Sequence, residues 1–193
     1  MTTTIYLLRH GAYHSPKPVV PYRLLGFHLS DEGIKQAQSR AETLKNVPII
    51  AIFTSPMERT LETAKIIAMP HGLTPIIDER LNEVRSPLQG KTKTQIDKLG
   101  GWFVYENEWY KKQGGESLSE ICSRVYACID EKMKEYERNT IVFVSHGDNL
   151  MLAAEYYKGL SISLATLTDQ PYVPMAGGFQ IDINDGKATI QSL

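Results

Sequence analysis

The chain has 193 residues, of which 42% are hydrophobic and 22% charged, a balance that is typical of a globular protein and excludes a largely disordered one. Its 21 basic and 22 acidic side chains leave a formal net charge of -1, which argues against nucleic-acid binding, because nucleic-acid-binding proteins usually carry a basic excess. This length predicts one domain over residues 1–193.

The first part of the chain predicts a strand followed by a helix. Residues 5–8 are an apolar run of the length of a buried strand. After a proline-rich loop, Ser30 is placed to cap a helix, and Asp31 and Glu32 suit the positive end of its dipole. The apolar face of this helix is predicted to comprise Ile34, Ala37, Ala41 and Leu44.

The next segment repeats this order. Residues 49–53 predict a second strand, and a short third strand is expected at residues 74–77. Between them, Ser55 and Glu58 have the spacing of a capping box, with Pro56 at the first helical position. We therefore expect a helix to begin directly after Ser55.

Residues 85–115 are the least regular segment. Thr92 and Gln95 have the spacing of a capping box, but two glycine pairs interrupt the pattern. The segment is predicted to be an excursion over the site rather than a second domain. It carries an aromatic cluster that either packs onto the core or lines a substrate pocket or partner surface: Trp102, Phe103, Tyr105, Trp109 and Tyr110.

The last part again alternates. Ser117 and Glu120 predict a capped helix, residues 140–144 a strand and residues 148–157 a helix. Asp185-Gly186 is a hairpin turn signal between two final strands. This order predicts an α/β protein of three layers, α/β/α, with a mostly parallel central sheet and an antiparallel edge.

The cysteines and the N-terminus indicate the compartment. Cys122 and Cys128 lie six residues apart in one predicted helix and point to different sides, so neither a disulfide nor a shared metal is expected. Residues 1–5 lack the pattern of a signal peptide, and no apolar run has the length of a membrane span. The sequence therefore predicts a cytoplasmic protein with neither a nucleic-acid nor a membrane partner.

The most informative residues are two histidines in matched positions. Arg9-His10-Gly11 follows the first predicted strand, and His146-Gly147 follows the strand at residues 140–144. In an open α/β sheet, ligands bind at the carboxyl ends of the strands. Two imidazoles beside an arginine at this edge indicate chemistry on an anion, and a phosphate fits best.

Phosphoryl transfer needs positive donors around the phosphoryl oxygens, a nucleophile in line with the leaving oxygen, and an acid to protonate that oxygen. Arg9, His10 and His146 supply the first two kinds of group. Arg59 lies in the first turn of a predicted helix, where free backbone donors also favour an anion. Glu83 is the preferred acid of a local acidic cluster.

At these residues the chain resembles the histidine phosphatase superfamily, also called phosphoglycerate mutase-like, and its phosphatase branch in particular. The matching segments occur in the family's order from residue 5 to about residue 150, and the ordered set is highly specific: Leu8-Arg9-His10-Gly11, Leu29-Ser30-Asp31-Glu32-Gly33, Thr54-Ser55-Pro56-Met57-Glu58-Arg59-Thr60 with Thr63-Ala64, Leu81-Asn82-Glu83, Gly115-Glu116-Ser117 and Val144-Ser145-His146-Gly147.

The resemblance implies the role of each residue. His10 would be the nucleophile that forms a phosphohistidine, and Glu83 would protonate the leaving group and then activate water. Arg9, Arg59 and His146 would hold the phosphoryl oxygens. No metal or other cofactor is implied, because these side chains already supply the positive charge.

The substrate is less defined. Arg23 and Arg85 are candidates for binding the rest of a small phosphorylated substrate. The chain lacks the Trp-Asn pair that the mutase branch carries in its first loop, which favours hydrolysis over mutase-type transfer between phosphoglycerates. A phosphohistidine or phosphoprotein phosphatase in signalling is a third possibility, and a homodimer is compatible with the sequence.

Overall fold

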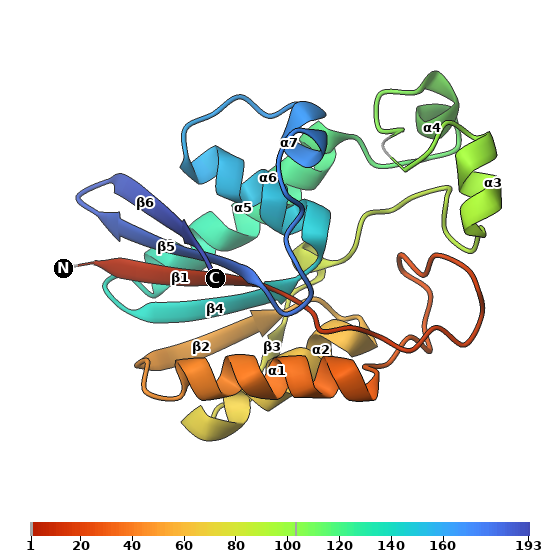
Figure 1. Ribbon diagram of the computed structural model, residues 1–193. Coiled ribbons are helices and arrows are strands. Elements are labelled where there is room, and N and C mark those ends of the chain that lie inside the picture. Colours follow the sequence, from red (N-terminus) through yellow and green to blue (C-terminus); the bar gives the residue numbers. More distant parts are fainter. Residues whose placement is uncertain (1, 103) are drawn as a thin grey trace.

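The computed structural model describes residues 2–102 and 104–193. Its centre is a sheet with the strand order β3-β2-β4-β1-β5-β6 (Figure 1). The strands are β1 (Thr3–Arg9), β2 (Ile49–Thr54), β3 (Ile76–Ile77), β4 (Thr140–Ser145), β5 (Gly178–Asn184) and β6 (Lys187–Ser192). The helices are α1 (Asp31–Leu44), α2 (Glu58–Ala68), α3 (Lys93–Lys98), α4 (Glu108–Lys112), α5 (Leu118–Glu135), α6 (Gly147–Tyr157) and α7 (Ala165–Thr168), with short 3₁₀ turns η1 (Met69–His71) and η2 (Glu79–Leu81).

The pairing of the strands confirms the predicted sheet. β3, β2, β4 and β1 run parallel, whereas β5 pairs antiparallel with β1 and β6 pairs antiparallel with β5. The β5–β6 turn is the predicted Asp185-Gly186 pair. Both residues have positive φ angles, 47° and 76°, as a tight hairpin turn requires.

Alternating side chains of the strands separate two hydrophobic cores. Tyr6 and Leu8 of β1 face the buried sides of α1 and α2, whereas Ile5 and Leu7 face α5 and α6. Figure 1 shows these two helix pairs on opposite sides of the sheet. The three-layer arrangement follows from this alternation and confirms the predicted fold class.

Helix α1 begins as predicted but buries a different face. The Ser30 hydroxyl accepts a hydrogen bond from the Gly33 backbone N–H at 3.1 Å. The prediction that Ile34 lies on the apolar face was wrong, since its side chain is 38% exposed. The buried row starts one residue earlier, at Gly33, because that glycine lies against the backbone of Ala12, where a Cβ atom would come within 1.8 Å of the carbonyl oxygen.

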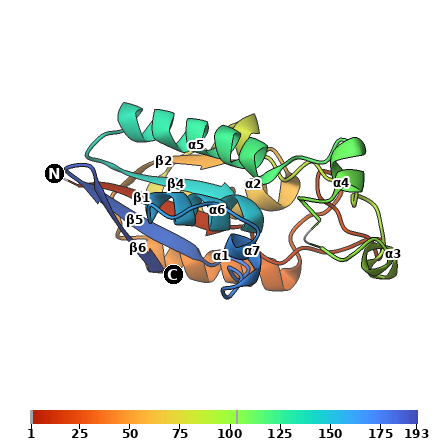
Figure 2. The ribbon, with the colours of Figure 1, turned by 90° about the horizontal axis from the view of Figure 1, so that it is seen from above.

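The segment from 85 to 115 carries α3 and α4, which lie beyond the carboxyl edge of the sheet in both views (Figures 1 and 2). The Thr92–Gln95 and Ser117–Glu120 capping boxes are both present. Of the aromatic cluster, Tyr105 and Tyr110 are buried in the core, Trp102 is 40% exposed, and Phe103 lies outside the described residues. Among the helices that the structure describes, none combines the length and apolar character of a membrane span.

Candidate active site

The two motif histidines meet at the carboxyl edge of the sheet. β1 and β4 are neighbouring parallel strands, and Arg9 pairs with Ser145 in their register. His10 and His146, the residues that directly follow these two strands, therefore lie side by side at the edge of the sheet. The ring centroids of His10 and His146 lie 5.4 Å apart, and the two side chains are almost completely buried.

His10 is held with one ring nitrogen free to react. Its Nδ1 lies 2.8 Å from the carbonyl oxygen of Gly11, which can only accept, so Nδ1 carries the proton. Nε2 then has a lone pair and accepts from Arg59 Nε at 3.3 Å. Burial, followed by the neighbouring Arg59 and His146, lowers the pKa of His10 well below its ordinary value. The ring is therefore neutral and nucleophilic near neutral pH.

The guanidinium groups of Arg9 and Arg59 are only partly paired. Arg59, in the first turn of α2, is 1% exposed, and its Nη2 donates to the carbonyl of Tyr22 at 2.9 Å. Arg9 Nη1 donates to the carbonyl of Val173 at 2.7 Å. The remaining groups, Arg9 Nε and Arg59 Nη1, are buried and find no acceptor among the described residues. An unsatisfied buried donor costs about 1–3 kcal/mol, and a bound oxyanion would remove this cost.

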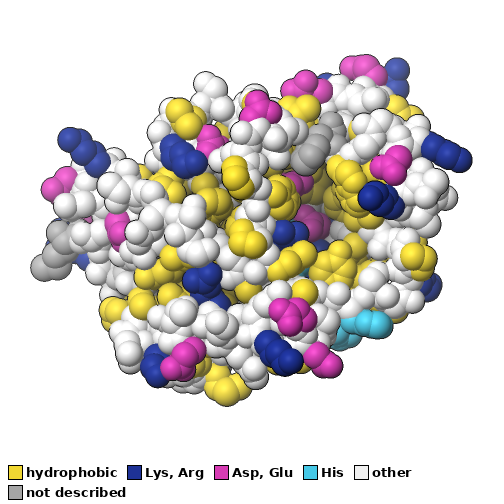
Figure 3. All heavy atoms as spheres, viewed as in Figure 1, with side chains coloured by type: hydrophobic (Ala, Val, Ile, Leu, Met, Phe, Trp, Pro, Cys, Tyr) yellow, Lys and Arg dark blue, Asp and Glu magenta, His cyan; other side chains and the backbone are white. Residues whose placement is uncertain are grey.

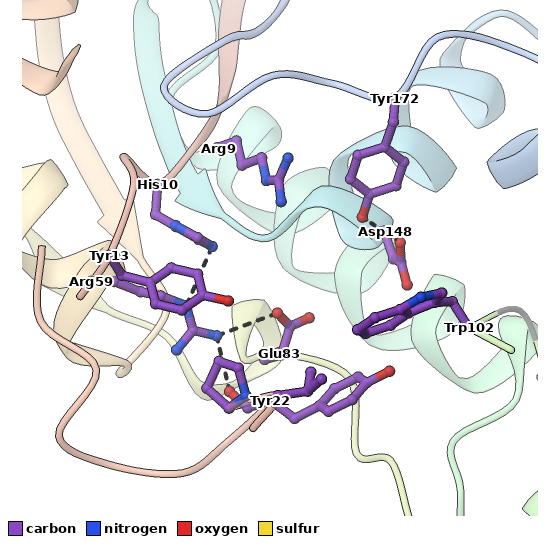
Figure 4. Close-up of a pocket in the computed structure, with 11 residues that line it drawn as sticks. Arg9, His10, Tyr13, Tyr22, Arg59, Glu83, Trp102, Asp148 and Tyr172 are labelled. Carbon is purple, nitrogen blue, oxygen red and sulfur yellow. Dashed lines mark hydrogen bonds and ion pairs between the residues drawn. The ribbon is translucent and has the colours of Figure 1, made fainter. Parts of the chain in front are cut away.

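The partly buried Glu83 and the fully buried His146 form a pair beside Arg59 (Figure 4 shows Arg59 and Glu83). Glu83 Oε2 lies 3.1 Å from His146 Nδ1 and 3.3 Å from Arg59 Nη2, and Oε1 accepts from the Val84 backbone N–H at 2.9 Å. Burial raises the pKa of Glu83, but the contacts with His146 and Arg59 outweigh it and hold this pKa below its ordinary value. Glu83 is thus ionised in the free site.

His146 is neutral in this pair. Burial lowers its pKa to about 4, although the Glu83 carboxylate opposes part of this shift. Its Nδ1–H donates to Glu83, and Nε2 accepts from the Ser55 hydroxyl at 2.8 Å. The prediction of a Ser55 capping box was wrong for this reason: the hydroxyl binds His146, and α2 begins at Glu58 after an uncapped Met57.

The loop that carries Glu83 is fixed from behind. Arg124 of α5 donates from Nη1 to the carbonyls of Arg80 and Asn82, each at 2.8 Å. The Glu116 carboxylate, which is 5% exposed, pairs with Arg124 Nε at 2.6 Å and accepts from the Arg85 backbone N–H at 3.0 Å. Glu116 therefore positions the segment around Glu83 and does not face the reacting groups.

Arg9, His10 and Arg59 line a cavity of about 320 Å³, at the small end of the roughly 300–1,000 Å³ range of ligand sites. In the space-filling view the surface is hollowed there, with charged side chains at the floor and hydrophobic ones at the rim (Figure 3). The cavity is lined by Arg9, His10, Tyr13, Val20, Pro21, Tyr22, Arg59, Glu83, Trp102, Asp148 and Tyr172.

The predicted site residues occupy three kinds of position. Arg9, His10, Arg59 and Glu83 line the cavity, and His146 lies behind them in contact with Arg59 and Glu83. The guanidinium groups of Arg23 and Arg85 lie outside the lining. The Arg23 guanidinium binds the Glu83 carbonyl and the Glu116 carboxylate, and the Arg85 guanidinium binds the Gly114 carbonyl.

The lining residues that sequence reasoning missed include three with polar groups, Tyr13, Asp148 and Tyr172, besides the apolar Val20 and Pro21. Asp148 had a usable signal, because it lies two residues after His146 in the first turn of the helix that leaves the same strand end. Tyr172 lies in a loop far along the chain, and the sequence gives no sign of its proximity to Arg9, whose guanidinium lies 5.0 Å from the tyrosine ring centroid.

Comparisons with known proteins agree with the geometry. Residues 5–193 match the model of the histidine phosphatase superfamily (branch 1). Phosphoserine phosphatase 1 of Hydrogenobacter thermophilus is 32% identical over 168 residues, which cover 83% of this chain and 78% of that protein. Bacillus stearothermophilus YhfR superposes with a TM-score of 0.84 at 27% identity, covering 98% of this chain and 96% of that one.

The mycobacterial glucosyl-3-phosphoglycerate phosphatase superposes with a TM-score of 0.82 at 21% identity, covering 100% of this chain and 98% of that one. At this identity the likeness concerns the fold alone. Together the comparisons confirm the resemblance that the ordered motifs indicated.

Proposed function

Since the chain belongs to the histidine phosphatase superfamily, we propose that it is a metal-independent phosphomonoester hydrolase that acts on a small phosphorylated metabolite through a phosphohistidine on His10. The observation that carries this proposal is that Arg9, His10 and Arg59 line one cavity and that two buried guanidinium nitrogens, Arg9 Nε and Arg59 Nη1, find no acceptor among the described residues. Two guanidinium groups match the charge of a phosphoryl dianion, so the site needs no metal for charge neutralisation.

The first step forms the phosphoenzyme. His10 Nε2 attacks the phosphorus, the bond between phosphorus and the ester oxygen breaks, and its electron pair stays on the leaving oxygen. That oxygen takes the proton that Glu83 has received from the bound phosphate monoester. Arg9 and Arg59 hold the phosphoryl oxygens, and the Nδ1–H of His146 turns from Glu83 to the same oxygens once Glu83 is protonated.

The second step releases phosphate. A water molecule attacks the phosphorus while Glu83, now a carboxylate, takes the proton of that water. The bond between phosphorus and Nε2 breaks, and its electron pair returns to the ring. This proton leaves with the phosphate, so Glu83 returns to the carboxylate form that it has in the free site.

The size of the cavity supports a small substrate. Tyr22 and Trp102 form part of its wall, and these residues belong to loops that a phosphorylated protein segment would have to displace. The sequence departures from the mutase branch favour water as the acceptor. A cytoplasmic location and a homodimer stay predictions of the sequence.

The test is hydrolysis of p-nitrophenyl phosphate in excess chelator. The wild-type protein should release phosphate, and a radiolabelled ester should leave an acid-labile label on the protein. His10→Ala should abolish both, while His71→Ala, which changes a histidine in η1 outside the cavity, should keep them. Absence of turnover in the wild type at every pH from 5 to 8 would refute the proposal.

Two other outcomes would point elsewhere. Isomerisation of a phosphoglycerate faster than phosphate release would indicate a mutase. Tight binding of a phosphoprotein without release of phosphate would indicate a binding role.

A further inference from the structure

Asp148 is a carboxylate in the cavity that the proposed reaction does not use. In Figure 4 it lies across the cavity from His10, with Glu83 between them in this view. The hydroxyl of Tyr172 donates to its Oδ1 at 2.5 Å, and the hydroxyl of Tyr105 donates to its Oδ2. An aspartate that only capped α6 would accept from the backbone N–H groups of that helix, whereas both oxygens of Asp148 accept from tyrosines.

Asp148 is the lining carboxylate that has no cationic side chain in direct contact among the described residues. The lining contains two guanidinium groups and two carboxylates among the described residues. Glu83 is paired with Arg59, and in the proposed reaction both guanidinium groups hold the phosphoryl group. Asp148 forms no ion pair with any described residue. Burial and, to a smaller extent, the charge of Glu83 raise the pKa of its carboxyl group, whereas the two tyrosine hydroxyls and the charge of Arg9 oppose part of that shift. A cation near Asp148 would stabilise its charged form.

The wall beside Asp148 is aromatic and apolar. Arg9 already lies over the ring of Tyr172, so the aromatic rings left for a ligand at this end of the cavity are those of Tyr22 and Trp102, beside Val20 and Pro21. Tyr22 has a φ of 42°, a left-handed conformation that bulky residues rarely adopt, and its carbonyl accepts from Arg59. Its backbone is therefore tied to the side chain that would hold the phosphoryl group.

A carboxylate among aromatic rings is the arrangement that recognises an organic ammonium. Resting on the proposed function, we propose that the leaving group of the substrate is an amino alcohol whose ammonium lies between Asp148, Trp102 and Tyr22. A carboxylate on the leaving group would find no third cation among the described lining residues, because the guanidinium groups of Arg23 and Arg85 bind elsewhere. Phosphate esters of ethanolamine and choline are therefore the probes to use.

The experiment compares pairs of esters that differ only in charge. Phosphocholine is paired with 3,3-dimethylbutyl phosphate, in which a carbon replaces the nitrogen, and phosphoethanolamine is paired with 2-hydroxyethyl phosphate. The wild type should prefer the cation in each pair by about tenfold to a hundredfold in kcat/KM, the range expected of a charge-assisted contact with aromatic support. Equal kcat/KM values within both pairs would overturn the inference.

Asp148→Asn removes the charge and keeps the shape, and it should reduce this preference to near one. The matched control is Asp130→Asn, because Asp130 also accepts from a tyrosine hydroxyl, that of Tyr157 at 2.6 Å, but does not line the cavity. This control should keep the preference. If Asp148→Asn instead lowered kcat/KM equally for all four esters, Asp148 would only position its two tyrosines, and the inference would be wrong.

Two further readings keep the test decisive. If Asp148→Asn does not fold, Trp102→Leu replaces it, because this side chain is 40% exposed and its ring should contribute severalfold of the same preference. An unchanged preference in Trp102→Leu would then count against the inference. If the protein hydrolyses p-nitrophenyl phosphate but does not prefer the cationic ester in either pair, this inference alone is overturned. If it hydrolyses no ester at all, the proposed function is overturned.

Discussion

Acidification should destabilise this protein through His146, and the size of the effect follows from its burial. Its pKa is lowered from 6.5 to about 4 in the folded protein. Below pH 6.5 the unfolded chain binds a proton that the folded chain excludes, so the free energy of unfolding falls as the pH decreases from 6.5 towards 4. The full slope is ~1.4 kcal/mol per pH unit, but the unfolded histidine is only half protonated at pH 6.5, so the interval between pH 6.5 and 4.5 corresponds to about 2 kcal/mol.

The assay is urea unfolding followed by tryptophan fluorescence at pH 7.5, 6.5, 5.5 and 4.5, for the wild type and His146→Gln. The wild type should lose about 2 kcal/mol relative to the variant between pH 6.5 and 4.5, because glutamine does not titrate. The contribution of Glu83 lies below this interval, since its pKa in the folded protein is also lowered. If the free energies of unfolding of the two proteins differed by the same amount at all four pH values, His146 would not be a buried neutral imidazole.

His28 provides a control of opposite sign. Its contact with Glu62 raises its pKa above 6.5. The folded protein therefore binds this proton more tightly than the unfolded chain, and the resulting stability is present at low pH and lost as the pH rises through the folded pKa. The wild type should accordingly gain stability relative to His28→Gln on acidification.

An NMR titration tests the His146 ring independently. A titration of this ring near pH 6.5 would contradict the lowered pKa of His146.

Two substitutions test the phosphoryl site and its support. Arg59→Lys keeps the positive charge but loses the planar set of guanidinium donors, so kcat should fall by about a hundredfold to a thousandfold in steady-state assays. A loss below tenfold would contradict the role of the guanidinium group. Gly33→Ala places a Cβ atom 1.8 Å from the Ala12 carbonyl oxygen, so it should lower the free energy of unfolding measured in urea by about 1–3 kcal/mol. Lys35→Ala, on the exposed side of α1, is the control and should not lower it. Equal stability of the two variants would refute the close approach of Gly33 to the Ala12 backbone.

The sequence predicts what local periodicity and chain order determine. Alternating strands and helices imply a parallel sheet, and in such a sheet the residues after β1 and β4 must share one edge. The sequence alone therefore predicts that His10 and His146 lie close together. The helix starts at Ser30 and Ser117 were predictable for a similar reason, since capping depends on residues within one turn.

Tertiary contacts decided the features that the sequence did not reveal. Ser55 has the local spacing of a helix cap, but a buried imidazole competes for its hydroxyl and binds it at 2.8 Å. Ile34 continues the apolar period of α1, yet the contact of Gly33 with the loop after His10 sets the buried face. Asp148 turns into the cavity because tyrosines from two distant segments donate to it, and no local pattern reports that contact.

The protonation state of Glu83 limits how the proposed reaction can begin. A general acid must hold a proton, but His146 and Arg59 keep this carboxyl group ionised in the free site. The proton must then arrive with the substrate, and a phosphate monoester can bring it, because its second pKa is about 6. The remaining dianion beside Glu83 would raise the pKa of the carboxyl group and keep the proton there until the ester oxygen leaves. The free site is thus arranged for an oxyanion, and the acid is created when that oxyanion binds, which predicts that kcat/KM declines as the pH rises above about 6.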